Sequence, residues 1–268
     1  MHLVGPMQNQ PTTHNLHISV WSPDRQGSGS FDGGKITEIK PIPFPQERGG
    51  SDRIGPLFYW AWASARGDGV IGMHPHQGFE IISYVMEGSV GHTDTAGNNR
   101  RVYAGGIQAM QTGSGISHQE EMHGERTEFL QIWFEPDMRA ALGQRPRYLD
   151  FEGSQIPREE LSDGVVAKHI VGPNGALRIQ APAVWDEIWI PEGVKYTIPI
   201  GNGEVVAFLI TEGAVVVEAN GEQSRLEERH FATAQSAASS NLTLVSDGTV
   251  KLTTIKVPQD PGYSLINL

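Results

Sequence analysis

Two histidines lie one residue apart in the segment GMHPHQGFEIISYVMEGSV, which spans residues 72–90. The alternating pattern and the glycine near its end predict that this segment forms a β-hairpin. Side chains at positions i and i+2 of a strand point to the same face, so His74 and His76 are expected to present two imidazoles to one side. Two imidazoles placed in this way are spaced to bind a single metal ion, and Pro75 would stiffen the step between them.

A second pair with the same spacing follows a glycine-rich stretch in TGSGISHQEE, residues 112–121. His118 and Glu120 are expected to point to one face, and two such pairs on facing strands would surround one ion with three imidazoles and a carboxylate. This ligand set suits Fe, Mn, Co, Ni, Cu or Zn and disfavours Ca or Mg. Glu80 has the same parity as His76, so on the residues alone it competes with Glu120 for the carboxylate position.

The remaining side chains near these motifs have weaker signals. His92 follows the hairpin and is interpreted as a surface residue or as a support for the site, whereas the face of His123 is undefined. The aromatic residues within 58–62 are predicted to pack in the core, and the alternative is that some of them form the wall of an apolar pocket.

Glycine and proline divide the chain into short segments, with 32 Gly and 17 Pro among 268 residues. From residue 78 to residue 134 the pattern is strand, turn, strand, which predicts an all-β fold of the sandwich or barrel kind. The polar, proline-bearing segment 135–151 is interpreted as a linker between two halves.

The second half of the chain has a sequence pattern similar to that of the first half. The segment EVVAFLITEGAVV, which begins at residue 204, superimposes without gaps on FEIISYVMEGSVG, which begins at residue 79. This similarity predicts two related β-domains in tandem. The same overlay places Pro199 and Gly201 where the first copy has its histidine pair. The hairpin therefore does not need the histidines to fold, which favours a function for the pair in the first copy.

Composition excludes several classes of protein. The absence of cysteine excludes a disulfide framework, a thiolate metal site and a cysteine nucleophile. The net charge of −11 disfavours nucleic acid or an anionic membrane as a partner, because both are polyanions. The N-terminus has no signal-peptide pattern, and no apolar run approaches the about 18–20 residues that span a bilayer. We therefore expect a cytoplasmic protein without direct nucleic acid or membrane binding, and a protein partner stays open.

Three consecutive motifs together resemble the pirin family of the cupin superfamily. They are HPHQGFEIISYVMEG, HTDTAGN and AGGIQAMQTGSGISHQE, and the similarity extends over residues 74–120 without a gap. Pirins read H-P-H-R-G-F-E, then H-x-D-x-x-G-N, then A-G-x-x-Q-x-M-x-A-G-x-G-I-x-H-x-E. The stretch 135–151 is also similar to the pirin interdomain segment, which carries P-R-Y.

The resemblance implies a bicupin, which consists of two antiparallel β-sandwich or jelly-roll barrels in tandem. The expected domains are a metal-binding N-terminal cupin at 1–137 and a C-terminal cupin without metal ligands at 138–268. The family's four ligands transfer to His74, His76, His118 and Glu120, which leaves Glu80 in a supporting or structural role. Pirins are usually monomers, and a monomer is expected here.

The resemblance also implies an activity. The expected cofactor is one divalent transition metal, Fe(II), with Mn, Co, Ni, Cu or Zn as alternatives. The favoured reaction is ring-cleaving oxidation of a flavonol-like aromatic substrate by O2, of the quercetin 2,3-dioxygenase type. Glu120 would be the catalytic base that takes the substrate's hydroxyl proton. The alternative is a non-enzymatic regulatory protein that binds a protein partner according to the redox state of its metal. Gln77, where the family has arginine, leaves the substrate itself open.

Overall fold

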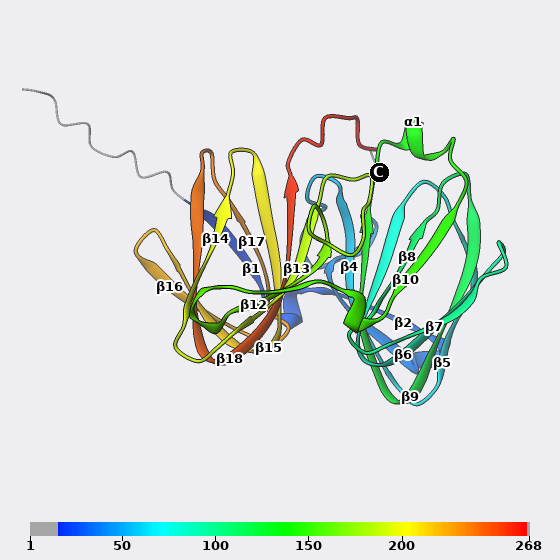
Figure 1. Cartoon of the computed structure of the whole chain (residues 1–268), viewed down its shortest axis with the longest axis horizontal. Helices are drawn as coiled ribbons and strands as arrows, with labels where there is room; N and C mark the ends of the chain where they lie inside the picture. Colours follow the sequence, from blue (N-terminus) through cyan, green and yellow to red (C-terminus); the bar gives the residue numbers. More distant parts are fainter. Residues whose placement is uncertain (1–15, 267–268) are drawn as a thin grey trace, which may run out of the picture.

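The computed structural model describes residues 16–266, and their regular structure is almost entirely β-strand (Figure 1). Two antiparallel sheets of nine strands each make up two lobes, which confirms the all-β bicupin prediction. The first sheet contains β2 (Gly27–Phe31), β3 (Ile36–Ile42), β4 (Leu57–Arg66), β5 (Gly69–His76), β6 (Glu80–Asp94), β7 (Asn99–Tyr103), β8 (Ile107–Gln111), β9 (Ile116–Phe134) and β10 (Arg147–Phe151).

The second sheet has a matching set of strands. They are β1 (His17–Trp21), β11 (Arg158–Glu160), β12 (Val166–Val171), β13 (Val184–Ile190), β14 (Lys195–Ile200), β15 (Glu204–Ala219), β16 (Glu222–Glu227), β17 (Phe231–Gln235) and β18 (Ser240–Pro258). The only α-helix in the described part of the chain is the single turn α1 (Met138–Ala141). No helix within residues 16–266 has the length and apolar character needed to cross a bilayer.

The two sheets share one topology. The first has the order β10-β8-β6-β9-β4-β3-β2, and the second has the order β1-β17-β15-β18-β13-β12-β11. Outside these paths, β5 pairs with β9 and β7 with β6, just as β14 pairs with β18 and β16 with β15. Each strand of one sheet therefore has a counterpart in the other, as the sequence overlay predicts.

The long central strands β6 and β15 bend at the same place. Their pairing register shifts around Gly88 and Gly213, whose φ angles are 72° and 78°. A Cβ atom added at either glycine would lie 2.4 Å from a backbone oxygen, that of Arg126 or of Thr249. Only glycine adopts this left-handed conformation without strain while permitting such a close approach. The bend is therefore a requirement of the fold in both copies.

Two strands are exchanged between the halves of the chain. The N-terminal strand β1 pairs with β17 in the second sheet, whereas β10 pairs with β8 in the first (Figure 1). The interpretation of 135–151 as a linker is wrong for β10, because β10 supplies backbone partners to the edge of β8. The division into 1–137 and 138–268 stays a prediction, and both exchanged strands cross it.

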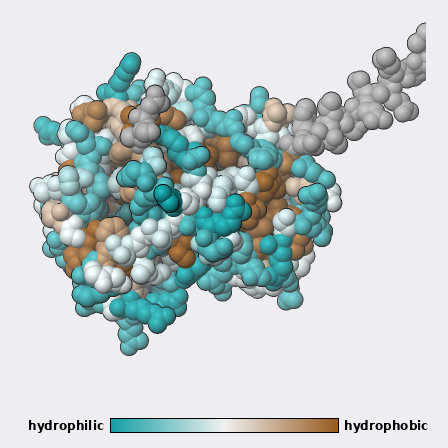
Figure 2. All heavy atoms as spheres, turned by 180° about the vertical axis from the view of Figure 1, so that it is seen from behind, coloured by the Kyte–Doolittle hydropathy of each residue, from teal (hydrophilic) through white to brown (hydrophobic). Residues whose placement is uncertain are grey.

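The lobes are joined by a continuous apolar core. One cluster of buried side chains contains residues of both sheets, and Trp60 of β4 meets Phe231 of β17 with ring centroids 5.4 Å apart. Tyr84 donates a hydrogen bond of 2.5 Å to Glu187 across the same junction. The buried aromatic residues of β4 therefore pack in the core, as expected. Figure 2 shows the two lobes from behind, with hydrophilic residues over much of this face and hydrophobic patches on both.

Candidate metal centre

Three predicted ligands converge where the end of β5 meets β9. His74 and His76 lie on β5, and His118 lies opposite them on β9, directly paired with His74. The Nε2 atom of His118 lies 3.1 Å from the Nε2 atoms of both other rings. Within residues 16–266, these three side chains form the group whose potential ligand atoms all lie within 4.8 Å of one another. His118 is buried, whereas His74 and His76 are half-buried.

The local geometry follows from an edge strand. Among the strands of residues 16–266, β5 pairs only with β9, and its register slips between Ile71 and His74. Proline is tolerated on an edge strand because its missing N–H faces no second partner, so Pro75 fits between the two histidines. The carbonyl oxygen of Gly72 lies 2.7 Å from Nδ1 of His74. A carbonyl only accepts hydrogen bonds, so Nδ1 of His74 carries the proton and its Nε2 presents a lone pair.

Hydrogen bonds alone do not satisfy these nitrogens. Because Nε2 of His74 is unprotonated, a hydrogen bond between His74 and His118 requires a proton on Nε2 of His118. A hydrogen bond between His76 and His118 requires a proton on the Nε2 atom of one of these two rings. If Nε2 of His118 carries a proton, that proton can be donated to only one of the two neighbouring rings. If Nε2 of His118 carries no proton, its lone pair faces the lone pair of His74. At most one of the two 3.1 Å contacts is therefore a hydrogen bond. A cation that accepts all three lone pairs fits the arrangement.

Electrostatics keep two of the rings neutral. Burial lowers the pKa of His76 to about 3, with further lowering by the neighbouring His118 and His74 rings. Burial also lowers the pKa of His118 to about 3, followed by the effects of His74 and His92. An imidazole binds a metal ion only in its neutral form. The site therefore holds these rings in the form that binds a metal at neutral pH.

Glu120 lies two residues beyond His118 on β9 and is 1% exposed. Its Oε1 atom accepts hydrogen bonds from Ser83 (3.1 Å) and Gln108 (3.0 Å), and its Oε2 atom accepts one from Gln131 (2.7 Å). A carboxylate offers about four acceptor positions, so one remains. The close group of ligand atoms contains the histidines and not Glu120, so its place as the fourth ligand stays a prediction.

The competing carboxylate, Glu80, has a different set of partners. It accepts hydrogen bonds from the backbone N–H groups of Gln180 (2.8 Å) and Ala181 (2.9 Å) and from the side chain of Gln111 (2.8 Å). The loop that it holds belongs to the second half of the chain. Glu80 is therefore committed to the junction between the lobes, which agrees with its expected structural role.

Gln77 and His123 also point to local partners. The side-chain amide of Gln77 donates a 3.1 Å hydrogen bond to the carbonyl of Ser114, so it ties the end of β5 to the turn before β9. His123 lies further along β9, with its Nε2 atom 3.2 Å from Oε2 of Glu121, and is not among the converging ligand atoms. Neither residue belongs to the group of converging ligand atoms.

A group of aromatic rings borders the histidines, and sequence reasoning missed it. The edge of Trp133 on β9 meets His76, with ring centroids 4.7 Å apart and planes at 90°. Phe44 and Phe79 lie 5.2 and 5.6 Å from Trp133, and all three rings are only partly buried. These residues come from three separate segments, and their apolar character alone marks them only as candidates for the core. We call Phe44, Phe79 and Trp133 the aromatic wall.

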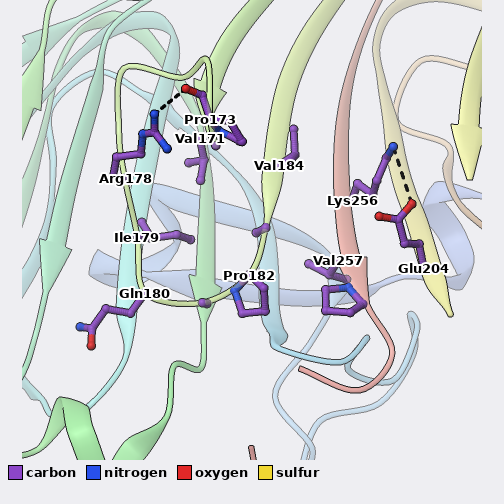
Figure 3. Close-up of a pocket in the computed structure, with 14 residues that line it drawn as sticks. Val171, Pro173, Arg178, Ile179, Gln180, Pro182, Val184, Glu204, Lys256 and Val257 are labelled. Carbon is purple, nitrogen blue, oxygen red and sulfur yellow. Dashed lines mark hydrogen bonds and ion pairs between the residues drawn. The ribbon is translucent and has the colours of Figure 1, made fainter. Parts of the chain in front are cut away.

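A sizeable cavity lies away from this centre, and none of the three histidines lines it. It measures about 460 Å³ and lies in the second lobe, between the loop 172–183 and the end of β18 (Figure 3). Its charged side chains include Lys256 and Glu204, whose nearest N and O atoms are 3.8 Å apart. The cavity behind His118 measures about 10 Å³ and is lined by Glu120, Gln108 and Tyr148 among others. A substrate at the histidines would therefore approach from the exposed side of His74 and His76.

Comparison with known proteins points to one family. The family model described as Pirin matches residues 60–134, which include all three converging histidines and Glu120. A Pseudomonas aeruginosa protein named "Putative quercetin 2,3-dioxygenase" is 33% identical over 184 residues, which cover 67% of this chain and 74% of that protein. A "Pirin-like protein" of Caulobacter vibrioides is 32% identical over 54% of this chain. The matching region spans 55% of the Caulobacter protein, somewhat more than half its length.

A solved structure shares the fold. The bacterial pirin YhhW from Escherichia coli, crystallised in complex with nickel(II), matches with a TM-score of 0.74. The match covers 90% of this chain and 99% of that chain at 21% sequence identity. At this identity the similarity shows the bicupin fold, and the ligand set of this chain depends on its own residues.

Proposed function

Because this chain belongs to the pirin family, we propose that it is a metal-dependent dioxygenase of the quercetin 2,3-dioxygenase type. The proposed reaction is ring-cleaving oxidation of a flavonol-like aromatic compound by O2. The observation that carries the proposal is the convergence of three imidazole nitrogens beside a partly exposed aromatic wall. A metal site and an aromatic binding surface then occupy the same place.

The metal is held by His74, His76, His118 and Glu120 in this proposal. Fe(II) is the expected ion, and Mn, Co, Ni, Cu and Zn are the alternatives, because nitrogen and oxygen ligands accept all of them. When bound, the metal supplies a Lewis acid and a redox-active centre for the reaction with O2. The contribution of the protein is to keep the imidazoles neutral and the carboxylate fixed.

The aromatic wall orients the substrate. Trp133 stands edge-on against His76, so an aromatic ring stacked on the wall lies next to the ligands. Offset-stacked or edge-to-face aromatic pairs each contribute roughly 0.5–1.5 kcal/mol beyond the burial of their area. Three partly buried rings therefore give a flat aromatic substrate a preference for this position over solvent.

Glu120 is the proposed base for the substrate hydroxyl proton. It is coupled to the wall, because Nε1 of Trp133 lies 3.4 Å from Oε1 of Gln131, and Nε2 of Gln131 donates to Glu120 at 2.7 Å. This arrangement fixes the orientation of the Gln131 amide and with it one carboxylate oxygen. A base must lie within hydrogen-bond reach of the proton that it takes, so in this proposal the substrate hydroxyl reaches past the imidazoles to the remaining acceptor position of Glu120.

Oxygen consumption tests the proposal directly. Protein loaded with Fe(II) is expected to take up O2 when quercetin is added, and the variant His74→Ala is expected to lose this uptake. The alternative prediction, a redox-dependent regulatory protein, gives no uptake in either sample. Absence of uptake with quercetin and with a panel of related flavonols, while bound iron is confirmed by elemental analysis, would contradict the dioxygenase proposal.

A further inference from the structure

A buried chain of three side chains leads from a carboxylate to the metal ligand His118. His92 lies behind His118, with their Nδ1 atoms 3.3 Å apart, and Nε2 of His92 lies 2.9 Å from Oδ2 of Asp94. His92 and His118 are each 2% exposed, and Asp94 is 6% exposed. Water therefore has little access to these contacts, and each nitrogen depends on its protein partner.

Asp94 is the fixed end of this chain. Its Oδ1 atom accepts hydrogen bonds from the backbone N–H groups of Ala96 (2.9 Å) and Asn98 (3.0 Å), and its Oδ2 atom accepts one from the amide of Asn98 (2.8 Å). Burial alone would raise the pKa of Asp94, but the hydrogen bonds from His92 and Asn98 lower it below the ordinary value. An ionised carboxylate only accepts hydrogen bonds, so Nε2 of His92 carries a proton.

The proton positions then propagate to the ligand. A neutral His92 with its proton on Nε2 presents a lone pair at Nδ1, which accepts a hydrogen bond from Nδ1–H of His118. The proton of His118 is thereby held on Nδ1, and its Nε2 lone pair faces His74 and His76. We propose that Asp94 and His92 are positioning residues that fix the tautomer of His118 so that its Nε2 atom is free to bind the metal. This inference rests on the proposed metal site and extends it.

A third side chain fixes the plane of the intermediate ring. Tyr148 stacks on His92 with ring centroids 4.2 Å apart and an interplanar angle of 25°. Tyr148 lies on β10, the strand that the second half of the chain contributes to the first sheet. Its hydroxyl has no hydrogen-bond partner within the described residues, so the contribution of Tyr148 is the stack itself. The exchange of β10 therefore also orients the ring that supports the ligand.

The chain offers well-matched variants for a test. His92→Gln keeps an amide that donates to Asp94 and accepts from His118, whereas His92→Phe keeps the ring stack and removes both hydrogen bonds. Tyr148→Phe is the matched control, because it deletes the hydroxyl and keeps the ring that stacks on His92. His92→Gln and Tyr148→Phe preserve the approximate volume of the buried side chain, which limits their effect on folding, whereas phenylalanine at position 92 is somewhat larger than histidine.

Nitrogen NMR of the metal-free protein, labelled with 15N in histidine, reports the tautomer without relying on activity. In the wild type, Nδ1 of His118 is expected to be protonated and Nε2 unprotonated at neutral pH. His92→Phe is expected to give a mixture of tautomers, and His92→Gln and Tyr148→Phe to retain the wild-type signal. In Ni(II) titrations, His92→Phe is expected to bind about 10–100-fold more weakly, with His92→Gln recovering most of the affinity.

The outcomes separate the two proposals. A wild-type His118 protonated on Nε2, or a His92→Phe variant that binds Ni(II) as tightly as the wild type, would overturn the positioning role. A wild-type protein that binds neither Ni(II) nor Fe(II) would overturn the proposed function. The tautomer of His118 in the metal-free protein would still decide the inference independently.

Discussion

The two sheets share a strand order and a glycine bend, yet their interiors differ where the first holds its histidines. In the first sheet Gln119 pairs with Thr93, and in the second Thr243 pairs with Glu218 at the equivalent step. The residues on either side of Gln119 are His118 and Glu120. Those on either side of Thr243 are two leucines, Leu242 and Leu244, which are both fully buried.

The neighbouring residues show the same difference, polar in the first sheet and apolar in the second. Ser83 pairs with Gln108 in the first sheet, and both donate hydrogen bonds to Glu120; the equivalent pair in the second sheet is Phe208 and Ala232. Both of the latter belong to an apolar cluster that contains the two leucines. Burial of a polar group costs free energy unless it is hydrogen-bonded, whereas burial of a leucine stabilises the fold. The polar interior of the first sheet is therefore not a requirement of the topology, and it is explained by a function.

The largest expected effect comes from giving the first sheet the residue of the second. His118→Leu removes the ring that contacts both other histidines. Changing a residue that only supports the ligands typically weakens metal binding by about 10–100-fold, so loss of a ligand should weaken it by at least about 100-fold. Titration with Fe(II) or Ni(II) and elemental analysis measure the loss. The control is Leu242→Ala in the second sheet, which should weaken the fold and leave one metal per chain. Equal metal content in wild type and His118→Leu would contradict the assignment.

Glu120 separates metal binding from turnover. Glu120→Ala is expected to abolish turnover even where some metal remains, because three imidazoles stay in place while the proposed base is lost; removal of a general base typically costs 10²–10⁴-fold. The measurement is O2 uptake with quercetin, normalised to bound metal. Glu120→Gln controls for the cavity that alanine leaves, since it keeps the volume of the side chain but cannot take the proton. Full activity in Glu120→Ala would exclude Glu120 as the base.

Acid should destabilise the metal-free protein through the first sheet. The pKa values of His76 and His118 are about 3 in the folded protein and near 6.5 when unfolded, so the unfolded chain binds more protons between these limits. The free energy of unfolding therefore falls as the pH decreases from 6.5 towards 3. Urea unfolding at pH 7 and pH 5 measures the change. His118→Leu should show a smaller decrease, and an equal decrease in both proteins would count against this explanation.

The smallest expected difference concerns the shared bend. Gly88→Ala and Gly213→Ala each place a Cβ atom 2.4 Å from a backbone oxygen at a positive φ angle. Each substitution is expected to lower the free energy of unfolding by roughly 1–3 kcal/mol, because the backbone conformation is strained for any residue with a Cβ atom. Chemical denaturation of the two variants measures the effect. A large loss for one glycine and none for the other would show that the two bends are not equivalent.

The parts of the molecule that could be predicted from sequence are those that follow from the alternation of side chains along a β-strand. The faces of β-strands placed His74, His76 and His118 together, and the spacing of glycines indicated an all-β tandem. The pairing of β1 and β10 with distant sheets was not predictable, because it depends on contacts between residues far apart in sequence. The same holds for the aromatic wall, which three segments build. The sequence left His92 as a surface or supporting residue, since its role depends on the position of Asp94 and on the ring of Tyr148.

The central claim is that only the first sheet binds a metal. Anomalous X-ray diffraction from crystals of the Ni(II)- or Fe(II)-loaded protein tests it most directly. We expect one anomalous peak, at about 2.0–2.2 Å from nitrogen atoms of His74, His76 and His118, with an oxygen of Glu120 as the fourth protein ligand. The claim would be contradicted by a peak in the second sheet or by a metal bound without Glu120. It would also be contradicted if crystals of protein shown to contain the metal gave no peak.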